Sequence, residues 1–293
     1  MDTKKAFAVL GGDLRQCHLA ELLSADGHAV SAYALDKYEF TGAVTRCYNL
    51  QELARRVDCV VLPLPVTNGA GLLNAPLSLD SYLLEDVFNL FATGQTVVAG
   101  KVDHNLFEKA GRNGVQLFDY LEREEFSVAN AIPSAEGAVQ LAMEELAITL
   151  RQARCLVIGY GRIGKLLAHY LRGFGADVTV SARKYGDIAW IEAFGYHSAH
   201  TAQLSGLLGT FDVIFNTVPA EVLDRALLRE LREDCLVIDL ASKPGGVNFA
   251  AAKQLGVRTI WALSLPGKVA PVTAACVMKQ TIYNILDEWR AKP

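Results

Sequence analysis

The sequence predicts an α/β protein with two doubly wound, Rossmann-like domains, joined by a bridging helix and separated by a cleft. Strand-like apolar runs alternate with helical patterns along all 293 residues. The runs are apolar on both faces, as in parallel strands that are covered by helices on both sides. Two of them, "AFAVLGG" and "CLVIGYGRIG", lead through glycines into a helical pattern.

The predicted elements fall into two series. The first series predicts an N-terminal substrate domain over residues 1–120, from "AFAVL" and a helix over 15–26 to "HAVSAYAL", "CVVLPLP", "TVVAG" and "VQLFDY". Residues 121–150 are expected to form a linker and the bridging helix, with Pro133 as a helix breaker and Ser134 as the N-cap. The second series, over 151–268, predicts a nucleotide-binding domain. A C-terminal helix over 269–293 is expected to pack back on the first domain.

Composition excludes several classes of protein. The net charge is −4 and no basic cluster is present, which argues against nucleic-acid binding. The sequence has no apolar window long enough for a membrane span and no signal peptide. The six cysteines form no C-x-x-C pair, and His197 and His200 lack a third ligand, so no metal site is predicted. We therefore expect a cytoplasmic protein without a membrane partner.

The second glycine motif predicts a dinucleotide site. Gly159, Gly161 and Gly164 form G-x-G-x-x-G between a strand-like run and a helical pattern. The first glycine permits the tight turn, the second lets the backbone approach a pyrophosphate, and the third allows close helix–strand packing. The alternative is a tight turn that binds nothing. The predicted contact segment is Gly159, Tyr160, Gly161, Arg162, Ile163 and Gly164.

The loop after the next strand favours NADP over NAD. An acidic residue there would bind the ribose 2′-hydroxyl of NAD, but the sequence reads "VTVSARKY". Ser181, Arg183 and Lys184 occupy this loop, and arginine can form a bidentate pair with a 2′-phosphate. The alternative is a solvated basic turn.

The first glycine motif is less suited to a dinucleotide. Gly11 and Gly12 are followed by Asp13, whose carboxylate would repel a pyrophosphate. The functional interpretation is that Gly12, Asp13, Arg15 and Gln16 help to hold an acidic substrate at a helix N-terminus. A purely structural turn fits the spacing equally well.

Loops rich in small residues and proline follow three strands of the second series. Open α/β sheets bind ligands at this end of their strands. Thr217, Val218 and Pro219 are expected on the nicotinamide side, while Ser242 and Lys243 are expected to reach a substrate carboxylate. Glu136 is a candidate acid or base, although an early acidic residue can also simply complement the helix dipole.

Two domains and a G-x-G-x-x-G motif also suggest the D-2-hydroxyacid dehydrogenases. That family needs a late catalytic histidine, and "LPGKVAPVTAACVMKQ" contains none. Lys243 stands near the position of that family's arginine. Both departures argue against this activity.

Six segments resemble, in order, the dipicolinate synthase A-subunit family of spore-forming bacteria. They are "AVLGGDLRQ", "FTGAV", "IPSAEGAVQLA", "VIGYGRIGKLLA", "DLASKPGGVNF" and "LPGKVAPVTAA". The resemblance spans nearly the whole chain. One departure concerns Lys243, where arginine is expected in some relatives, so its role as a carboxylate clamp loses the bidentate fork.

The resemblance implies an oxidoreductase that converts 4-hydroxy-tetrahydrodipicolinate, a dicarboxylate of the lysine pathway, into dipicolinate during sporulation, with electrons passing to NADP. It implies a flavoprotein-like B subunit of the same synthase and a location in the mother cell. Substrate contacts are then assigned to Gly12, Asp13, Arg15, Gln16, Ser134, Ser242, Gly245 and Gly246, and catalysis to Glu136 and Lys243. We also expect a homo-oligomer. The alternatives are another NADP-dependent dehydrogenase and a non-catalytic NADP sensor.

Overall fold

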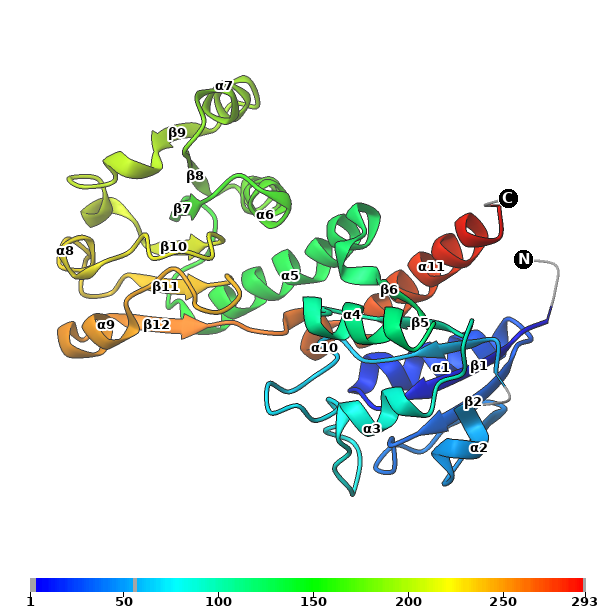
Figure 1. The fold of residues 1–293 in the computed structure, drawn as a ribbon. Coiled ribbons are helices and arrows are strands. Elements are labelled where there is room, and N and C mark those ends of the chain that lie inside the picture. The colour runs from blue at the N-terminus through cyan, green and yellow to red at the C-terminus, as the bar shows by residue number, and fades with distance from the viewer. Residues whose placement is uncertain (1–3, 55–56, 292–293) are drawn as a thin grey trace. The chain divides into compact units, whose positions relative to one another are not determined.

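The computed structural model describes residues 4–54 and 57–291. Within them the chain forms two compact units, which we describe separately (Figure 1). Unit 1 comprises residues 1–130 and 270–293, and unit 2 comprises residues 131–269. No helix in the described part of the chain is both long enough and apolar enough to cross a membrane.

Unit 1 is built on a parallel sheet with the strand order β3-β2-β1-β4-β5-β6. Its strands are β1 (Ala6–Leu10), β2 (Ala29–Tyr33), β3 (Val44–Arg46), β4 (Cys59–Val61), β5 (Thr96–Ala99) and β6 (Gln116–Asp119). Its helices are α1 (Leu14–Ala25), α2 (Leu50–Ala54), α3 (Leu84–Asn89), α4 (His104–Arg112), the 3-10 helix η1 (Tyr120–Glu122) and α11 (Pro271–Arg290).

Helix α11 completes unit 1 by packing on α1. Its apolar stripe, which includes Met278, Ile282 and Ile285, joins the core that β1 and α1 form. Burying each such side chain contributes about 1.5–3 kcal/mol. At the edge of this contact, Asp26 accepts hydrogen bonds from Lys279 (2.7 Å) and Tyr283 (2.8 Å). Burial raises the pKa of Asp26, but these two donors outweigh it and leave the pKa below its usual value.

Unit 2 contains the second parallel sheet, with the strand order β12-β11-β10-β7-β8-β9. Its strands are β7 (Arg154–Ile158), β8 (Asp177–Ala182), β9 (His197–His200), β10 (Val213–Asn216), β11 (Leu236–Asp239) and β12 (Arg258–Trp261). Its helices are α6 (Arg162–Gly173), α7 (Tyr185–Ala193), α8 (Arg225–Leu228), α9 (Phe249–Leu255) and α10 (Leu265–Val269), with the 3-10 helices η2 (Thr201–Gln203) and η3 (Leu208–Thr210).

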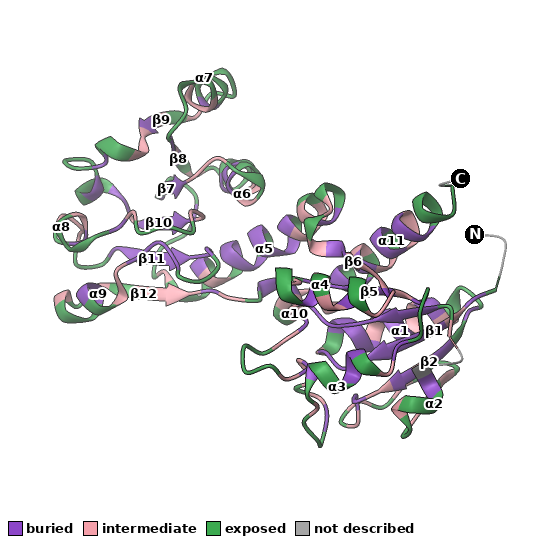
Figure 2. Ribbon diagram, viewed as in Figure 1, coloured by how far each residue is buried: buried purple, intermediate pink, exposed green. Residues whose placement is uncertain are grey.

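Both sheets have the Rossmann strand order, which confirms the predicted fold class. Figure 2 shows the strands largely buried and the outer sides of the helices exposed, as expected for sheets that are covered on both faces. In each sheet the order reverses beside the first strand, at β1/β4 and β7/β10. A ligand of an open α/β sheet binds at this reversal, and each glycine motif lies there.

The bridging helix differs from the prediction in both its start and its end. Helix α5 (Glu124–Glu145) is continuous and contains Pro133 in its interior, so Ser134 is a buried helical residue and not an N-cap. Proline removes one backbone hydrogen bond, but small buried residues in the following turns, Ala135, Ala138 and Ala142, pack into the core of unit 2. This packing outweighs the local preference of proline. The division between the two units falls within α5, after Asn130.

Candidate nucleotide and substrate site

The glycine loop after β7 is a turn that other residues cannot form. Gly159 has φ +100°, and a Cβ atom there would lie 2.4 Å from Oγ1 of Thr217. A Cβ atom at Gly164 would lie 2.1 Å from the carbonyl oxygen of Gly159, which is a backbone atom that cannot move aside. The first and third glycines are therefore needed for the turn and for the contact of α6 with β7.

Gly161 has a different role, because it faces open space. No heavy atom lies within 4 Å of a Cβ atom built there, and Gly161 is the N-cap of α6 without a side-chain capping bond. The first N–H groups of a helix have no partner within the helix and carry partial positive charge. The chain therefore leaves a space with backbone donors at the start of a 12-residue helix, which fits a pyrophosphate.

The other residues of the motif lie around this opening. Arg162 begins α6 and is exposed, while Ile163 and Tyr160 are half-buried. The ammonium group of Lys165 lies 5.3 Å from the centre of the Tyr160 ring. The segment from Gly159 to Gly164 thus offers backbone donors and positive charge to a bound phosphate group.

The loop after β8 divides into a buried and an exposed part. Ser181 is fully buried, its hydroxyl accepts a hydrogen bond from Thr201 (3.2 Å), and its carbonyl accepts one from the N–H of Gly159 (2.9 Å). Ser181 therefore supports the glycine loop through these hydrogen bonds, and the expected contact of its side chain with the cofactor stays a prediction. Arg183 and Lys184 are exposed, and within the described residues neither side chain forms an ion pair.

The loop after β10 is tied to the end of β7. The N–H and the hydroxyl of Thr217 both donate to the carbonyl of Ile158, each at 2.9 Å. Val218 is half-buried and Pro219 is exposed. This loop therefore forms a fixed edge beside Gly159, at the reversal of strand order where the nicotinamide side was predicted.

A buried polar pair that the sequence analysis missed holds the loop after β11. Asn216 and Asp239 end the neighbouring strands β10 and β11, and both are fully buried. Asp239 accepts hydrogen bonds from the side-chain amide of Asn216 (2.8 Å) and from the N–H groups of Ala241 (3.0 Å) and Gly246 (2.8 Å). The signal in the sequence is a polar residue at the end of each of two apolar runs, "VIFN" and "LVID".

Hydrogen bonds within this loop use the N–H groups of two glycines that were predicted to contact substrate. The N–H of Gly246 is bound to Asp239, and the N–H of Gly245 donates to the carbonyl of Ser242 (2.8 Å). Both N–H groups maintain the turn in this structure, and a contact of these glycines with substrate stays a prediction. Ser242 and Lys243 remain exposed at its tip, and within the described part of the chain Lys243 forms no ion pair.

The glycine loop of unit 1 is held by hydrogen bonds of the side chains that follow it. Asp13 is the N-cap of α1 and forms a capping box with Gln16, while Gly12 adopts φ +99° before it. The guanidinium of Arg15 donates to Asp13 through Nε (2.9 Å) and Nη2 (2.8 Å), and Nη2 also donates to the carbonyl of Leu64 (2.6 Å). Arg15 and Gln16 are buried. The structural role of this turn is therefore evident, and its contact with substrate stays a prediction.

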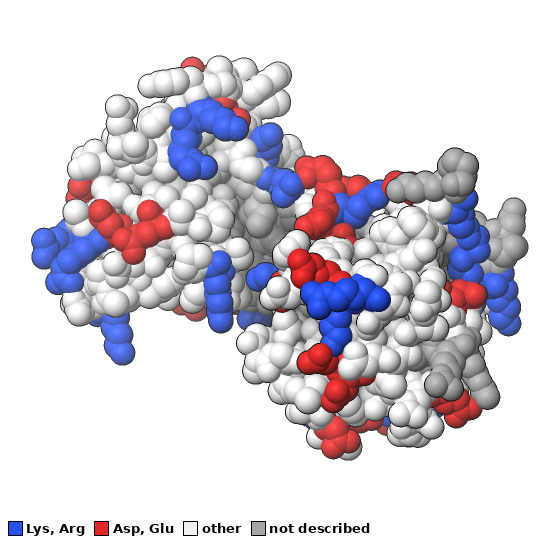
Figure 3. Space-filling model, in the orientation of Figure 1, with Lys and Arg blue, Asp and Glu red and all other residues white. Residues whose placement is uncertain are grey.

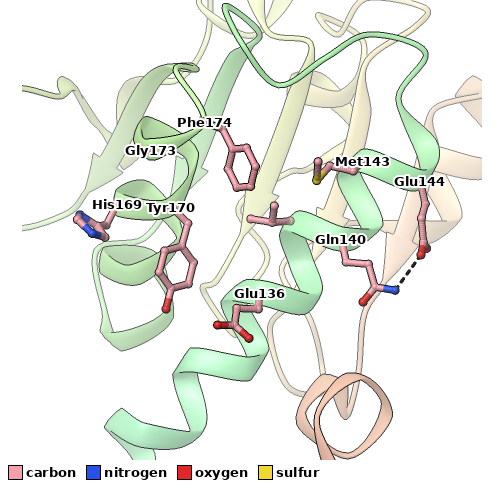
Figure 4. A pocket seen from close by; sticks show the side chains of 9 residues that line it. Glu136, Gln140, Met143, Glu144, His169, Tyr170, Gly173 and Phe174 are labelled. Carbon is pink, nitrogen blue, oxygen red and sulfur yellow. Dashed lines mark hydrogen bonds between the residues drawn. The ribbon is translucent and has the colours of Figure 1, made fainter.

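Glu136 lines a pocket of unit 2 whose lining includes no residue of the glycine loop. It is exposed on α5 and lines a pocket beside Tyr170, which is in the third turn of α6 (Figure 4). Burial raises the pKa of Tyr170, and the carboxylate of Glu136 raises it further. Ser134, two residues closer to the start of α5, is buried. The catalytic role of Glu136 stays a prediction.

The surface charge and the possible metal ligands bear on two other kinds of site, for nucleic acids and for metal ions. Acidic and basic side chains are interspersed on the visible face of each unit in Figure 3, without a broad basic patch. Within residues 4–54 and 57–291, His, Cys, Asp and Glu side chains form no group of three suited to a metal ion.

Comparisons with known proteins match both units. Residues 6–121 match the family model of the N-terminal domain of the dipicolinate synthase A subunit, and residues 128–242 match that of the D-isomer specific 2-hydroxyacid dehydrogenase NAD binding domain. The dipicolinate synthase A subunit of Bacillus subtilis (strain 168) is 32% identical, over 100% of this chain and 99% of that protein.

Solved structures agree with these matches. The crystal structure of the dipicolinate synthase A subunit from Bacillus halodurans has a TM-score of 0.89 and 32% identity, with 100% of both chains covered. The corresponding crystal structure from Bacillus subtilis has a TM-score of 0.88 and 29% identity, with 100% of this chain and 99% of that chain covered.

Proposed function

Because this chain belongs to the dipicolinate synthase A-subunit family, we propose that it is an NADP-dependent oxidoreductase that forms dipicolinate from 4-hydroxy-tetrahydrodipicolinate. The observation that carries the proposal is the open glycine loop at Gly161 in a chain that is similar to this family over its whole length. A nicotinamide cofactor fits unit 2, since residues 128–242 match an NAD-binding domain.

The proposed reaction removes water and then two hydrogens from the ring. Loss of the 4-hydroxyl as water gives a dihydropyridine dicarboxylate. Removal of one hydride and one proton then gives the aromatic ring of dipicolinate. When bound, the nicotinamide accepts the hydride. Aromatisation supplies much of the driving force, so the protein mainly has to orient the ring and accept a proton.

The exposed tip of the loop after β11 is the proposed contact for a substrate carboxylate. Lys243 supplies a positive charge there and Ser242 supplies a hydroxyl donor. The buried pair Asn216 and Asp239 fixes the turn that carries both residues. A lysine contributes a mobile point charge, whereas the planar fork of arginine would fix the orientation of the carboxylate.

Arg183 is proposed to select NADP over NAD. We expect Arg183→Ala to weaken NADP binding by about 10- to 100-fold, since hydrogen bonds to charged groups contribute about 1.5–3 kcal/mol. Affinity for NAD should stay unchanged, because NAD has no 2′-phosphate. Calorimetric titration with both nucleotides measures this, with the exposed Arg229→Ala as a matched control. An equal loss of both affinities would contradict the assignment.

Glu136, or a water molecule that it holds, is proposed as the acceptor of the ring proton. Glu136→Gln keeps the shape of the side chain and removes the base, so turnover should fall by about 100-fold or more with unchanged NADP affinity. Full turnover in this variant would show that Glu136 is not the base. Gln140→Glu, one turn further along the exposed side of α5, is the control for a change of charge there.

The family name also suggests how the protein works in the cell. We propose that it acts with the flavoprotein-like B subunit of dipicolinate synthase, in the cytoplasm of the mother cell of a sporulating bacterium, on a branch of the lysine pathway. Its partners are then this second protein and the small dicarboxylate substrate.

A direct assay tests the proposal. Freshly prepared 4-hydroxy-tetrahydrodipicolinate is supplied with NADP or NAD, with and without the flavoprotein-like partner, and reduced nicotinamide is followed by absorbance. Turnover by this chain alone places the whole catalytic site in it, and turnover only with the partner makes the site shared or activated by that protein. NADP binding without turnover under any condition favours the sensor. Turnover of a different substrate in a broad screen favours another dehydrogenase.

A further inference from the structure

Three parts of the proposed site follow three neighbouring strands of unit 2. The glycine loop follows β7, the proposed nicotinamide edge at residues 217–219 follows β10, and the proposed carboxylate contact at Lys243 follows β11. In the sheet, β10 lies between the other two strands (Figure 1). It ends at Asn216, whose neighbours in the strand register are Ile158 of β7 and Asp239 of β11. Asn216 therefore lies between the proposed cofactor side and the proposed substrate side.

The side-chain amide of Asn216 binds toward both sides. Its Nδ2 donates to the carboxylate of Asp239 (2.8 Å) and to the carbonyl of Val218 (3.0 Å). Its Oδ1 accepts a hydrogen bond from the N–H of Val218 (3.2 Å). Asn216 is fully buried, and the three bonds engage both polar atoms of the amide. One planar group therefore holds the nicotinamide edge and, through Asp239, the loop that carries Lys243.

The loop after β11 packs directly on this amide. A Cβ atom at Gly246 would lie 2.1 Å from Nδ2 of Asn216 and 2.5 Å from the carbonyl oxygen of Val218. The carbonyl of Gly246 also accepts hydrogen bonds from the N–H groups of Val222 and Leu223, each at 3.0 Å. No side chain fits between the two loops at this point. In so close a packing, a shift of one loop displaces the other.

We propose that Asn216 is a positioning residue, which fixes the carboxylate contact at Lys243 relative to the nicotinamide edge. The inference rests on the proposed function and deepens it, and Asn216 acts through its neighbours because it is fully buried. Hydride transfer needs the reacting atoms within about 3–3.5 Å of each other, and a displacement of about 1 Å costs on the order of 100-fold in rate. A bond between the two loops therefore affects the rate of transfer more than the affinity for the nucleotide.

The kinetic test uses Asn216→Ser in the full chain, assayed with the flavoprotein-like partner if turnover requires it. The serine hydroxyl is one bond closer to the backbone, so it still accepts from the N–H of Val218 but withdraws from Asp239. We expect kcat to fall by about 100-fold. The dissociation constant of NADP should change by less than about threefold, because the pyrophosphate is expected at the glycine loop. Asn216→Thr, which keeps more of the side-chain volume, is a second variant with the same expected result.

Val178→Ala is the control for a general loss of stability. Val178 is buried near the start of β8, at the opposite end of the strands from the two loops. Its substitution should lower the melting temperature, because it leaves a cavity, while kcat measured well below that temperature should stay unchanged. A loss of kcat in Asn216→Ser that Val178→Ala does not reproduce therefore reports on positioning and not on stability.

Amide hydrogen exchange tests the link between the loops without any turnover. Saturating nucleotide, NADP or NAD, should slow the exchange of residues 159–164 and of residues 240–246 in the wild-type chain. In Asn216→Ser only residues 159–164 should keep this protection, because the amide no longer transmits the ordering to the second loop. If the wild-type chain binds nucleotide without turning over 4-hydroxy-tetrahydrodipicolinate, the proposed reaction is wrong, and the exchange measurement still decides the role of Asn216.

Results of two kinds would overturn the proposal. The first is a kcat of Asn216→Ser that equals the wild-type value, or that falls only in proportion to the affinity for NADP. The second concerns the protection of residues 240–246 by nucleotide. The proposal is wrong if the wild-type chain does not show this protection, or if Asn216→Ser shows it unchanged.

Discussion

Replacing Gly161 by alanine is expected to abolish nucleotide binding and to leave the thermal stability of the chain unchanged. A Cβ atom at Gly161 meets no protein atom within 4 Å, so the fold accepts it. The same atom would occupy the space in which the pyrophosphate approaches the first N–H groups of α6. We expect the affinity for NADP to fall by at least 100-fold in calorimetric titration, with an unchanged melting temperature.

Two other glycines serve as controls for this prediction. Gly164→Ala should lose stability as well as binding, because its Cβ atom would lie 2.1 Å from a backbone oxygen. Gly111→Ala, within α4 and free of contacts, should bind NADP normally and gain up to about 1 kcal/mol of stability. Retained NADP binding in Gly161→Ala would show that the pyrophosphate does not approach this loop.

Replacing Asp239 by alanine should cause the largest loss of stability among the single substitutions considered for unit 2. The change removes the acceptor for three buried donors, the N–H groups of Ala241 and Gly246 and the amide of Asn216. An unsatisfied buried donor costs about 1–3 kcal/mol, so we expect a total loss of about 3–5 kcal/mol. This corresponds to a fall of roughly 10–15 °C in the melting temperature of the unit.

A second aspartate of unit 2 provides a control for the position of the substitution. Asp234→Ala removes an exposed carboxylate that pairs with Arg232, and should leave the melting temperature almost unchanged, because exposed ion pairs contribute little to stability. Asp239→Asn keeps the side-chain volume, but its NH2 group would face one of the three donors. Its loss of stability should therefore be intermediate. Calorimetry of the full chain measures all three variants. A loss for Asp239→Ala no larger than that for Asp234→Ala would contradict the role of the buried carboxylate.

The fold could be predicted because its signals are local and repeated. Strands such as β1, β7 and β11 are buried on both faces, so each appears as an uninterrupted apolar run. The edge strands β3 and β9 escaped prediction because "VTR" and "HSAH" contain almost no apolar residue, and their strand pairing depends on a neighbour that is distant in the sequence. The continuity of α5 through Pro133 likewise depends on packing.

Residues of the candidate site could be predicted from the sequence where only one residue type fits sterically. Only glycine fits at Gly159 and Gly164, and the spacing of the two within the motif shows this without a structure. The use of the N–H of Gly246 in "KPGG" could not be predicted, because it depends on Asp239, which belongs to another element. The burial of Ser181 could not be predicted for a related reason, since the burial of a residue at the end of a strand depends on the elements that pack over it.

Because α11 returns to unit 1, unit 1 can be completed only after unit 2 has been synthesised. Unit 2 is one uninterrupted segment, residues 131–269, whereas unit 1 is made of residues before and after it. The helix that covers α1 therefore leaves the ribosome only after all of unit 2. Until then Leu19 and Leu23 lack their partners Met278 and Ile282, and an apolar surface stays uncovered. A nascent chain that stops before α11 keeps a complete second unit but exposes the face on which the first unit is prone to aggregate.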